Sequence, residues 1–375
     1  MQRLGAVRRW LGVVAVAAVT ISLPAVVSGR PASVAGESAP ALLASARGST
    51  GVAYEGYVES TGSLGLPAIG WLKDTATLLG RTSRLRVWWG DLTHYRVDLL
   101  SPAGERDTYR EGGVIVQWDS DRRRVTTTTA DDGPRTPVAA DLTPPELARR
   151  LLAPAGRSEL STGPTGRVAG RPARRLDVRV ADRRVLAGRI SVWVDVATGL
   201  PLRVAVVPRG QHHEVLSSGF LQVRIGRPAA ARLQFVPPPD ADHQVSSLPT
   251  ITDLAERLPR SWLPDRLGDL VRRDDLRGAE AYPGLHSSAV ATYGNGYALV
   301  AVMPVDAYDA RMLVDRYASP LHPVQHRYYG DEITLGTPLV SALLLSGSLR
   351  GFALVGTVSS GQLDRFARTV VEARP

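Results

Sequence analysis

The segment Ser191–Val207, SVWVDVATGLPLRVAVV, constrains the fold of this 375-residue chain more than any other. Apolar residues alternate with other positions from Val192 to Val196 and again from Leu202 to Val206. A period of two is typical of a β-strand that buries one face. Between the two halves lies Gly199, which tolerates the positive φ that a tight turn needs. The segment therefore predicts a long β-hairpin within a sheet.

Further strands surround this hairpin. In the run Arg84–Trp89, alternation places Trp89 on one face together with Leu85 and Val87, so Trp88 must face the opposite side. Roughly eleven closely spaced strands with few helices indicate a curved, partly open antiparallel sheet. The other predicted strands are Val52–Ser60, Tyr95–Leu99, Val114–Trp118, Val125–Thr129, Arg174–Val180, Val215–Ile225 and Arg232–Val236.

Two short helices are predicted in the same part of the chain. Ala41–Arg47 precedes the first strand, and a second helix follows Thr143-Pro144-Pro145-Glu146. The latter sequence has the form of a capping box with proline at the first helical position. The second helix ends near Pro154.

A proline-rich run, Pro237–Ser247, separates two parts of the chain that differ in character. Consecutive prolines form a semi-rigid spacer and interrupt a sheet. The sequence therefore predicts a larger domain over residues 41–240 and a smaller α+β domain over residues 250–375. Within the smaller domain, hairpins are predicted at Ser287–Met303 and Leu339–Val358. Helices are expected at Thr250–Leu258, Asp306–Tyr317, with Met312 and Leu313 as its apolar contacts, and Ser359–Glu372.

The N-terminus carries an export signal. Arg3, Arg8 and Arg9 precede an apolar run from Trp10 to Val27. A basic stretch followed by an apolar one is typical of a secretory signal, and this run is also nearly long enough to span a bilayer. Residues 1–35 fit both a cleaved signal peptide and an uncleaved membrane anchor. Either way, the body of the protein is expected outside the cytoplasm.

Composition excludes several classes of chemistry. The chain has no cysteine, which rules out disulfides, thiolate metal sites, a cysteine nucleophile and lipid attachment at an N-terminal cysteine. Only Lys73 among the 45 basic residues is lysine. The net charge of +9 favours anionic lipid head groups or an acidic partner. Because basic residues are scattered and form no stripe interleaved with aromatics, no nucleic-acid partner is expected.

Candidate catalytic or metal-binding residues form no recognisable site. His322 and His326 have the spacing of a metal pair, but Pro323 argues against a regular helix between them. Nucleophile elbows, S-x-x-K motifs and phosphate-binding loops do not occur. The sequence therefore predicts neither an enzyme nor a metal site, and no cofactor.

The segment Leu64–Leu79, LGLPAIGWLKDTATLL, is apolar, rich in glycine and not periodic. Loops normally face water, so an apolar loop either packs on its own domain or lines a ligand cavity. Trp71 fits an aromatic-lined pocket best. The predicted apolar cavity comprises Leu64, Leu66, Ile69, Trp71, Leu72, Leu78 and Leu79 from this loop, with Val87 and Trp89 beneath it.

Three stretches carry a resemblance to a known family: residues 52–67, the strand series 84–100 running into 109–125, and the hairpin. The element W-x-D-x-x-T-G-L-P-L at Trp193–Leu202 is the most specific of them. Together they resemble the extracytoplasmic LolA-like superfamily over residues 41–240. Within it, they resemble the MucB/RseB-type sigma-E regulatory proteins, which add a smaller C-terminal domain after a linker. Weak similarity at 337–347 and 351–359 agrees with that layout.

The resemblance implies a half-barrel sheet with helices and loops on its concave face, enclosing a cavity for acyl chains or a lipid-modified ligand. It also implies contact with the extracytoplasmic part of a membrane-bound anti-sigma factor, which the protein would shield until an envelope-stress ligand displaces it. The predicted function is thus an exported regulator, secreted or tethered at the membrane surface. The alternative is a lipid or lipoprotein carrier of the cell envelope without a signalling role.

Overall fold

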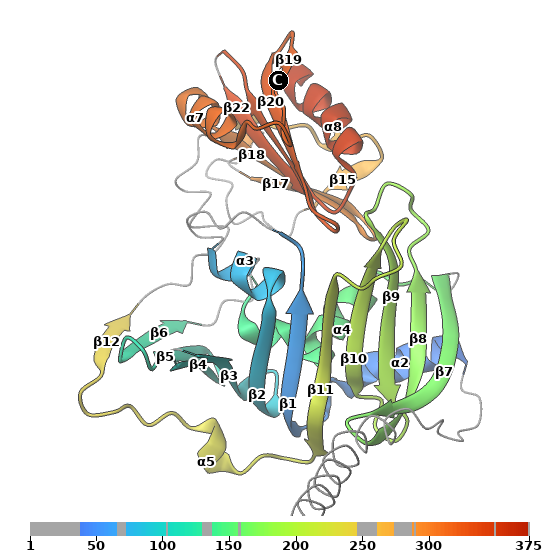
Figure 1. The fold of residues 1–375 in the computed structure, drawn as a ribbon, viewed down its shortest axis with the longest axis vertical. Coiled ribbons are helices and arrows are strands. Elements are labelled where there is room, and N and C mark those ends of the chain that lie inside the picture. Colours follow the sequence, from blue (N-terminus) through green and yellow to red (C-terminus); the bar gives the residue numbers. More distant parts are fainter. Residues whose placement is uncertain are drawn as a thin grey trace, which may run out of the picture.

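A computed structural model of the chain describes residues 38–65, 73–102, 104–129, 137–156, 159–245, 261–273, 287–288, 290–348 and 350–373. These residues form an α+β structure that is mostly strands with few helices (Figure 1). The N-terminal apolar run and the predicted helix Thr250–Leu258 lie outside the described residues. Among the residues that are described, no helix is long and apolar enough to span a membrane.

The first sheet contains twelve strands in the order β12-β6-β5-β4-β3-β2-β1-β11-β10-β9-β8-β7. Figure 1 shows that this sheet is curved, because β3 to β6 turn away from the plane in which β1 and β7 to β11 lie. The strands are β1 Tyr54–Gly62, β2 Thr82–Asp91, β3 His94–Ser101, β4 Gly104–Glu111, β5 Val114–Asp119, β6 Arg124–Thr129, β7 Leu160–Val168, β8 Arg171–Arg179, β9 Ala187–Asp195, β10 Pro201–Pro208, β11 Leu216–Ile225 and β12 Asp242–Val245.

Two meanders make up this sheet, β1 to β6 and β7 to β11, and β1 joins them by pairing antiparallel with β11. All neighbouring strands are antiparallel except β12, which pairs parallel with β6 at one edge. The strand predicted at Arg232–Val236 is wrong. Ala230–Leu233 instead forms a single helical turn, α5, and Phe235 packs against Tyr109 at 5.1 Å between ring centres.

Short helices pack on the first sheet. Leu42 and Leu43 of α2 (Ala39–Gly48) and Leu152 of α4 (Pro144–Leu152) belong to one buried cluster with alternate residues of β8, β9 and β10. Both helices were predicted, and the structure confirms them. Two further short segments are the 3-10 turn η3 (Ala139–Leu142), just before α4, and the helix α3 (Lys73–Gly80).

The predicted capping box at α4 is not formed. The Thr143 hydroxyl donates to the carbonyl of Ala140 at 2.9 Å, and Glu146 pairs with Arg149 at 2.7 Å. The reason is η3, because its 3-10 turn places an acceptor within reach of the hydroxyl. Asp141 takes the role expected of Glu146, because its carboxylate accepts a hydrogen bond from the backbone nitrogen of Val138 at 2.9 Å.

The hairpin predicted from Ser191–Val207 is confirmed as β9 and β10. Gly199 has a φ of +74°, and a Cβ there would lie 2.5 Å from the hydroxyl oxygen of Ser45. Asp195 organises the turn, since its Oδ1 accepts from the backbone nitrogen and the hydroxyl of Thr198, both at 2.9 Å. Arg171 donates to both carboxylate oxygens of Asp195, at 2.6 and 3.1 Å.

The second sheet has eight antiparallel strands in the order β14-β15-β17-β18-β22-β21-β20-β19. A small separate ladder pairs β13 (Ser261–Trp262) with β16 (Ser287–Ser288). Among the described residues, the helices of this part are α7 (Ala307–Tyr317) and α8 (Ser360–Glu372). The strands are β14 Arg266–Leu267, β15 Leu270–Arg272, β17 Ala291–Asn295, β18 Ala298–Val305, β19 Gln325–Arg327, β20 Gly330–Gly336, β21 Ser341–Ser346 and β22 Gly351–Gly356.

The helices α7 and α8 pack on opposite faces of this sheet. Phe352 shares a buried cluster with Phe366 of α8, whereas a Cβ on the adjacent Gly351 would lie 2.2 Å from the Cβ of Ala310 in α7. The predicted cap of α7 is confirmed, since Asp306 accepts from the nitrogen of Tyr308 at 2.8 Å. The expected contact at Met312 is wrong, because that side chain is 54% exposed.

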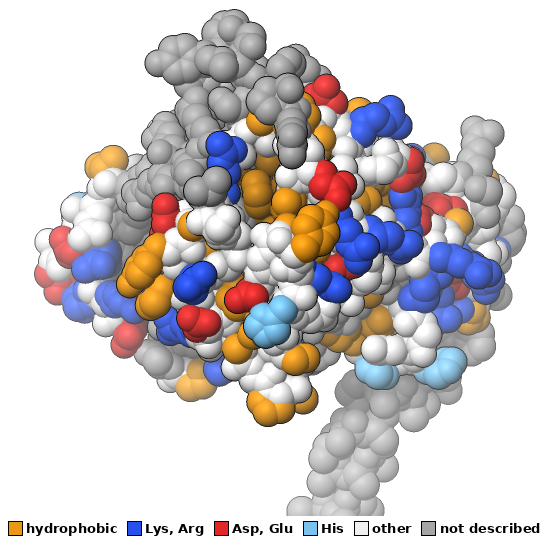
Figure 2. All heavy atoms as spheres, turned by 90° about the horizontal axis from the view of Figure 1, so that it is seen from above, with side chains coloured by type: hydrophobic (Ala, Val, Ile, Leu, Met, Phe, Trp, Pro, Cys, Tyr) orange, Lys and Arg blue, Asp and Glu red, His pale blue; other side chains and the backbone are white. Residues whose placement is uncertain are grey.

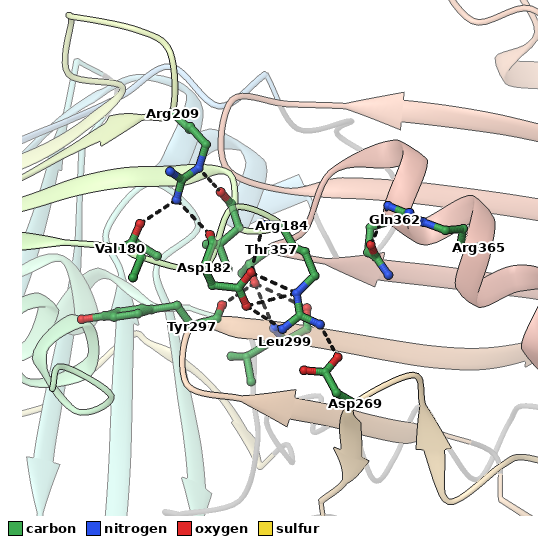
Figure 3. A network of polar contacts seen from close by, with 12 residues as sticks. Val180, Asp182, Arg184, Arg209, Asp269, Tyr297, Leu299, Thr357, Gln362 and Arg365 are labelled. Carbon is green, nitrogen blue, oxygen red and sulfur yellow. Dashed lines mark hydrogen bonds and ion pairs between the residues drawn. The ribbon is translucent and has the colours of Figure 1, made fainter. Parts of the chain in front are cut away.

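The connection between β8 and β9 joins the two sheets (Figure 3). Val185 forms a β-bridge with Val358, and the nitrogen of Leu186 donates to the carbonyl of Thr357 at 2.9 Å. Arg184 pairs with Asp182 at 2.7 Å and also with Asp269 of the second part. We refer to residues 182–186 with these partners as the clasp.

Asp195 is expected to stabilise the hairpin in a pH-dependent way. Burial alone would raise the pKa of Asp195, but bonds from Arg171 and Thr198 outweigh burial and lower it. The stabilisation is therefore present above the unfolded pKa, about 3.9, and is lost as pH falls through the folded pKa. Asp195→Asn should lower the free energy of unfolding by about 2–3 kcal/mol at pH 7.

Urea unfolding at pH 7 and at progressively lower pH measures this difference. The difference in the free energy of unfolding between wild type and Asp195→Asn should disappear on acidification. A difference that stays constant would contradict the role assigned to Asp195. Asp315→Asn, on the exposed side of α7, makes the same change of charge and serves as the control.

Candidate functional site: a cavity with an arginine-rich lining

Alternation along β2 to β6 divides the first sheet into two faces. Trp89 is 3% exposed and lies in a buried cluster with Leu85 and Val87, while Trp88 lies on the other face beneath the guanidinium of Arg96. The structure thus confirms that the two tryptophans point to opposite sides. We call the Trp89 side the inner face and the Trp88 side the outer face.

Aromatic side chains fill the inner face along β1 to β3. Trp89 stacks on Tyr95 at 4.5 Å and on Tyr54 at 5.9 Å between ring centres, and Phe220 meets Tyr54 edge-on at 5.3 Å. Stacked and edge-to-face rings at these distances form a close-packed core. This part of the inner face is therefore packed protein rather than open space.

Open space lies farther along the same face. A cavity of about 530 Å³ is bounded by the inner residues of β3 to β6, by α3 and by residues 137–139. This volume lies within the usual range of small-molecule sites. Its apolar walls include Leu78, Leu99, Val138 and Ala139. The hydroxyl and amide groups that line it belong to Thr75, Thr77, Thr82, Ser83, Ser101, Thr108, Gln117 and Thr126.

The charged lining of the cavity is mainly basic. Four arginines and two aspartates contribute a net charge of +2: Arg81, Arg106, Arg122 and Arg124 with Asp74 and Asp119. Strand register explains part of this arrangement, because Asp119 lies directly opposite both Arg106 and Arg124 on the neighbouring strands. The cavity therefore combines an apolar wall with a surplus of guanidinium groups.

Three of the four arginines have ion-pair partners. Arg122 lies 2.9 Å from Asp119. Arg106 lies 3.4 Å from Asp119 and 3.7 Å from Asp74, and Arg124 lies 3.2 Å from Asp242 of β12. Burial raises the pKa of Asp119, but the backbone bond from Arg122 and the nearby guanidinium groups outweigh burial and lower it. Arg81 is exposed and has no ion pair among the described residues.

The wider surface is also charged. On the face seen in Figure 2, basic side chains lie among acidic ones instead of forming one continuous stripe. The cavity places part of the protein's positive charge next to apolar walls.

The structure separates the residues that the sequence predicted for an apolar cavity. Leu78 lines the cavity, whereas Val87 and Trp89 lie in the packed core and do not line it. Leu64 is buried, and its nitrogen donates to the carbonyl of the half-buried Leu79 at 3.1 Å. Their role in ligand binding stays a prediction. The remaining members, Leu66, Ile69, Trp71 and Leu72, lie outside the described residues.

The segment expected as an irregular apolar loop ends in a helix. Residues Lys73–Gly80 form α3, in which Ala76 and Leu78 are buried. A backbone hydrogen bond joins the two ends of this segment, since the nitrogen of Gly62 donates to the carbonyl of Arg81 at 3.1 Å. Sequence reasoning missed the arginines of the cavity. The sequence pattern that could have revealed these arginines is the alternation in β4 to β6. There, polar residues occupy the face that apolar residues occupy in β2 and β3.

A second charged cluster lies on the outer face. Asp98, Glu105 and Asp107 carry oxygens within 4.8 Å of one another. Arg96 donates to Asp98 at 2.6 and 2.9 Å and to Asp107 at 3.0 Å, and Arg86 contacts Asp98 at 3.4 Å. A divalent cation would have to displace these guanidinium groups, so the cluster is a structural ion-pair network.

Asp107 should make folding less favourable as pH rises. Burial, followed by the charge of Asp98, raises the pKa of Asp107 to about 7. Because this folded pKa lies above the unfolded value of about 3.9, stability contributed by the protonated form is lost as pH rises towards 7. Asp107→Asn keeps an acceptor for Arg96 and adds a donor for Asp98.

The variant should therefore gain on the order of 1–2 kcal/mol over wild type between about pH 4 and pH 8. Urea unfolding across that range measures the difference. If Asp107→Asn instead loses stability relative to wild type as pH rises, the buried pair is a stabilising ionised network and the assigned direction is wrong.

Comparisons with known proteins find likeness in structure. No family model matches the sequence, and no curated protein matches it. The chain is similar to the MucA/MucB complex of Pseudomonas aeruginosa, at 18% identity and a TM-score of 0.48 over 88% of this chain and 96% of that one. MucB in another crystal structure gives 18% identity and a TM-score of 0.43 over 88% and 97%.

A LolA superfamily protein from Nitrosomonas europaea matches at 10% identity and a TM-score of 0.24, over 53% of this chain and 99% of that one. These are the proteins that the sequence resembles, MucB/RseB-type and LolA-like. At these levels of similarity, the likeness assigns neither a ligand nor a partner to this chain.

Proposed function

We propose that this protein is an exported binding protein that takes up a lipid-like or acylated ligand and modulates a membrane-bound anti-sigma factor. The observation that carries the proposal is the cavity between β3 to β6 and α3, with apolar walls beside a surplus of arginines. An acyl chain is buried favourably against apolar walls, and guanidinium groups pair with anionic head groups. The protein binds this ligand and does not transform it.

The curvature of the first sheet supports a half-barrel with its helices on the concave side. In this arrangement α2, α4 and η3 cover one part of the inner face, and the cavity occupies another part of it. The N-terminal apolar run provides export and, if retained, a tether. The net charge of +9 favours residence at an anionic membrane surface.

The proposed protein partner is the extracytoplasmic part of an anti-sigma factor. Support comes from the sequence element W-x-D-x-x-T-G-L-P-L, which the structure forms as the β9–β10 hairpin, and from the second sheet that follows the first. MucB has been solved in complex with MucA, and we propose a contact of that kind here. Ligand uptake would then weaken the hold on the partner.

A matched pair of substitutions tests the cavity. Thr126 lines the cavity, and the next residue, Thr127, faces the other side of the same strand. Thr126→Trp should fill part of the cavity and weaken the binding of dansyl-undecanoate, an anionic fluorescent amphiphile, on the order of ten-fold. Titration of the dansyl fluorescence measures the dissociation constant.

Thr127→Trp places the same bulk outside the cavity and should leave binding within about two-fold of wild type. Circular dichroism and the unfolding midpoint check that both variants fold. Equal effects of the two substitutions on probe binding would locate the ligand elsewhere.

The anti-sigma partner is tested with extracytoplasmic segments of the anti-sigma factors encoded by the same organism. At least one segment should bind the protein with a dissociation constant in the micromolar range or below, as isothermal titration calorimetry measures. Saturating dansyl-undecanoate should weaken that binding. A protein that carries amphiphiles but binds none of these segments would be a lipid carrier without a signalling role.

A further inference from the structure

The segment after β11 wraps around the edge of the first sheet. It crosses the outer face of β2 to β4 with α5, where Phe235 contacts Tyr109, and then forms β12 beside β6 (Figure 1). The proline run Pro237-Pro238-Pro239 lies between these two contacts. The segment therefore reaches the cavity from the outside of the sheet.

Two carboxylates at the end of this segment bind the arginines of the β5–β6 turn. Asp240 pairs with Arg123, and Asp242 pairs with Arg124 at 3.2 Å. The nitrogen of Asp242 also donates to the carbonyl of Arg123 at 2.9 Å. Arg123 has a φ of +51°, a conformation that is uncommon for a residue other than glycine. The carboxylates of the segment therefore meet the β5–β6 turn at and next to a residue with positive φ.

Arg124 belongs to two sites at once. Its side chain lines the cavity, and its Nε donates to Asp242 of β12. Register explains this, because Asp242 lies directly beside Arg124 in the parallel β6–β12 pair. Any anion that binds Arg124 from the cavity therefore competes with Asp242.

The strand β12 is weakly held. It has four residues, all exposed, and forms the parallel pair in an otherwise antiparallel sheet. The side chains of Arg124 and Asp242 are 41% and 57% exposed. Exposed ion pairs of this kind contribute little to stability, so a competing anion does not have to overcome a strong contact.

We propose that residues Asp240–Val245 act as a displaceable acidic latch, and that an anionic head group in the cavity takes Arg124 from Asp242 and releases β12 from β6. The head group gains contacts that Asp242 lacks, since Arg81 and Arg106 line the same cavity. The inference rests on the proposed function for its ligand and adds how binding reaches the rest of the chain.

Release of the latch has two consequences. The edge of β6 loses its partner strand, which leaves unpaired N–H and C=O groups that an extended peptide pairs with readily. The connection between the two sheets also gains residues 242–245, because β12 is no longer paired with β6. Occupancy of the cavity is thereby converted into a change at the edge of the first sheet.

Hydrogen exchange of the full-length protein tests the latch. Dodecyl phosphate should speed the exchange of the backbone amides of residues 242–245 several-fold, as mass spectrometry of peptides from this region measures. Dodecyl maltoside, with the same chain and no charge, should leave the exchange of these amides unchanged. Inorganic phosphate alone shows whether the anionic group suffices without a chain.

Removing the competing carboxylate should strengthen binding. Asp242→Asn should bind dodecyl phosphate about three- to five-fold tighter than wild type, the fold-change that the loss of an exposed ion pair allows. Asp315→Asn on α7 makes the same change of charge away from the cavity and should bind as wild type does.

The outcomes separate the latch from the proposed function. If dodecyl phosphate binds, but the exchange of residues 242–245 and the effect of Asp242→Asn do not differ from the controls, the latch is wrong and the binding function stands. If only the Asp240→Asn/Asp242→Asn variant binds dodecyl phosphate, the two carboxylates block the site in the wild type, the head group does not displace them, and the displaceable latch is wrong. If neither protein binds dodecyl phosphate or dansyl-undecanoate, both proposals are wrong.

Discussion

The antiparallel pairing of β1 with β11 holds the first sheet together. It joins two meanders whose strands are otherwise local in the chain, and it places β1 between β2 and β11. Tyr54 and Val58, both at most 1% exposed, fix the register of β1, because a slip of one residue would turn them out of the core. The same register decides which side chains of β2 to β6 share the inner face, and hence where the cavity lies.

Charged residues on that sheet follow the alternation as strictly as apolar ones do. On the inner face, Asp119 lies between Arg106 and Arg124 beside open space. On the outer face, Asp98 lies beside Asp107 and is almost fully buried. Burial raises the pKa of Asp98 and of Asp107, whereas the backbone bond from Arg122 and the nearby guanidinium groups outweigh burial and lower the pKa of Asp119. The inner row is therefore charged and borders open space, while the outer row is buried in a structural ion-pair network.

Sequence periodicity predicted much of this fold because the signal is local. The hairpin at Asp195, the opposite faces of Trp88 and Trp89, and the helix α8 each follow from spacing alone. The cavity did not follow, since periodicity tells which residues share a face but not which stretch of that face another element leaves uncovered. The pair formed by Arg124 and Asp242 spans 118 positions, and no local pattern relates residues so far apart.

The two parts of the molecule are connected in two ways that differ in strength. The clasp combines the bridge between Val185 and Val358, backbone bonds and the ion pair of Arg184 with Asp269, and apolar residues of both parts share one buried cluster. The contacts of β12 are exposed and few by comparison. Release of β12 therefore leaves the second sheet held by the clasp. An anion in the cavity would thus expose the edge of β6, and the two parts of the molecule would stay together.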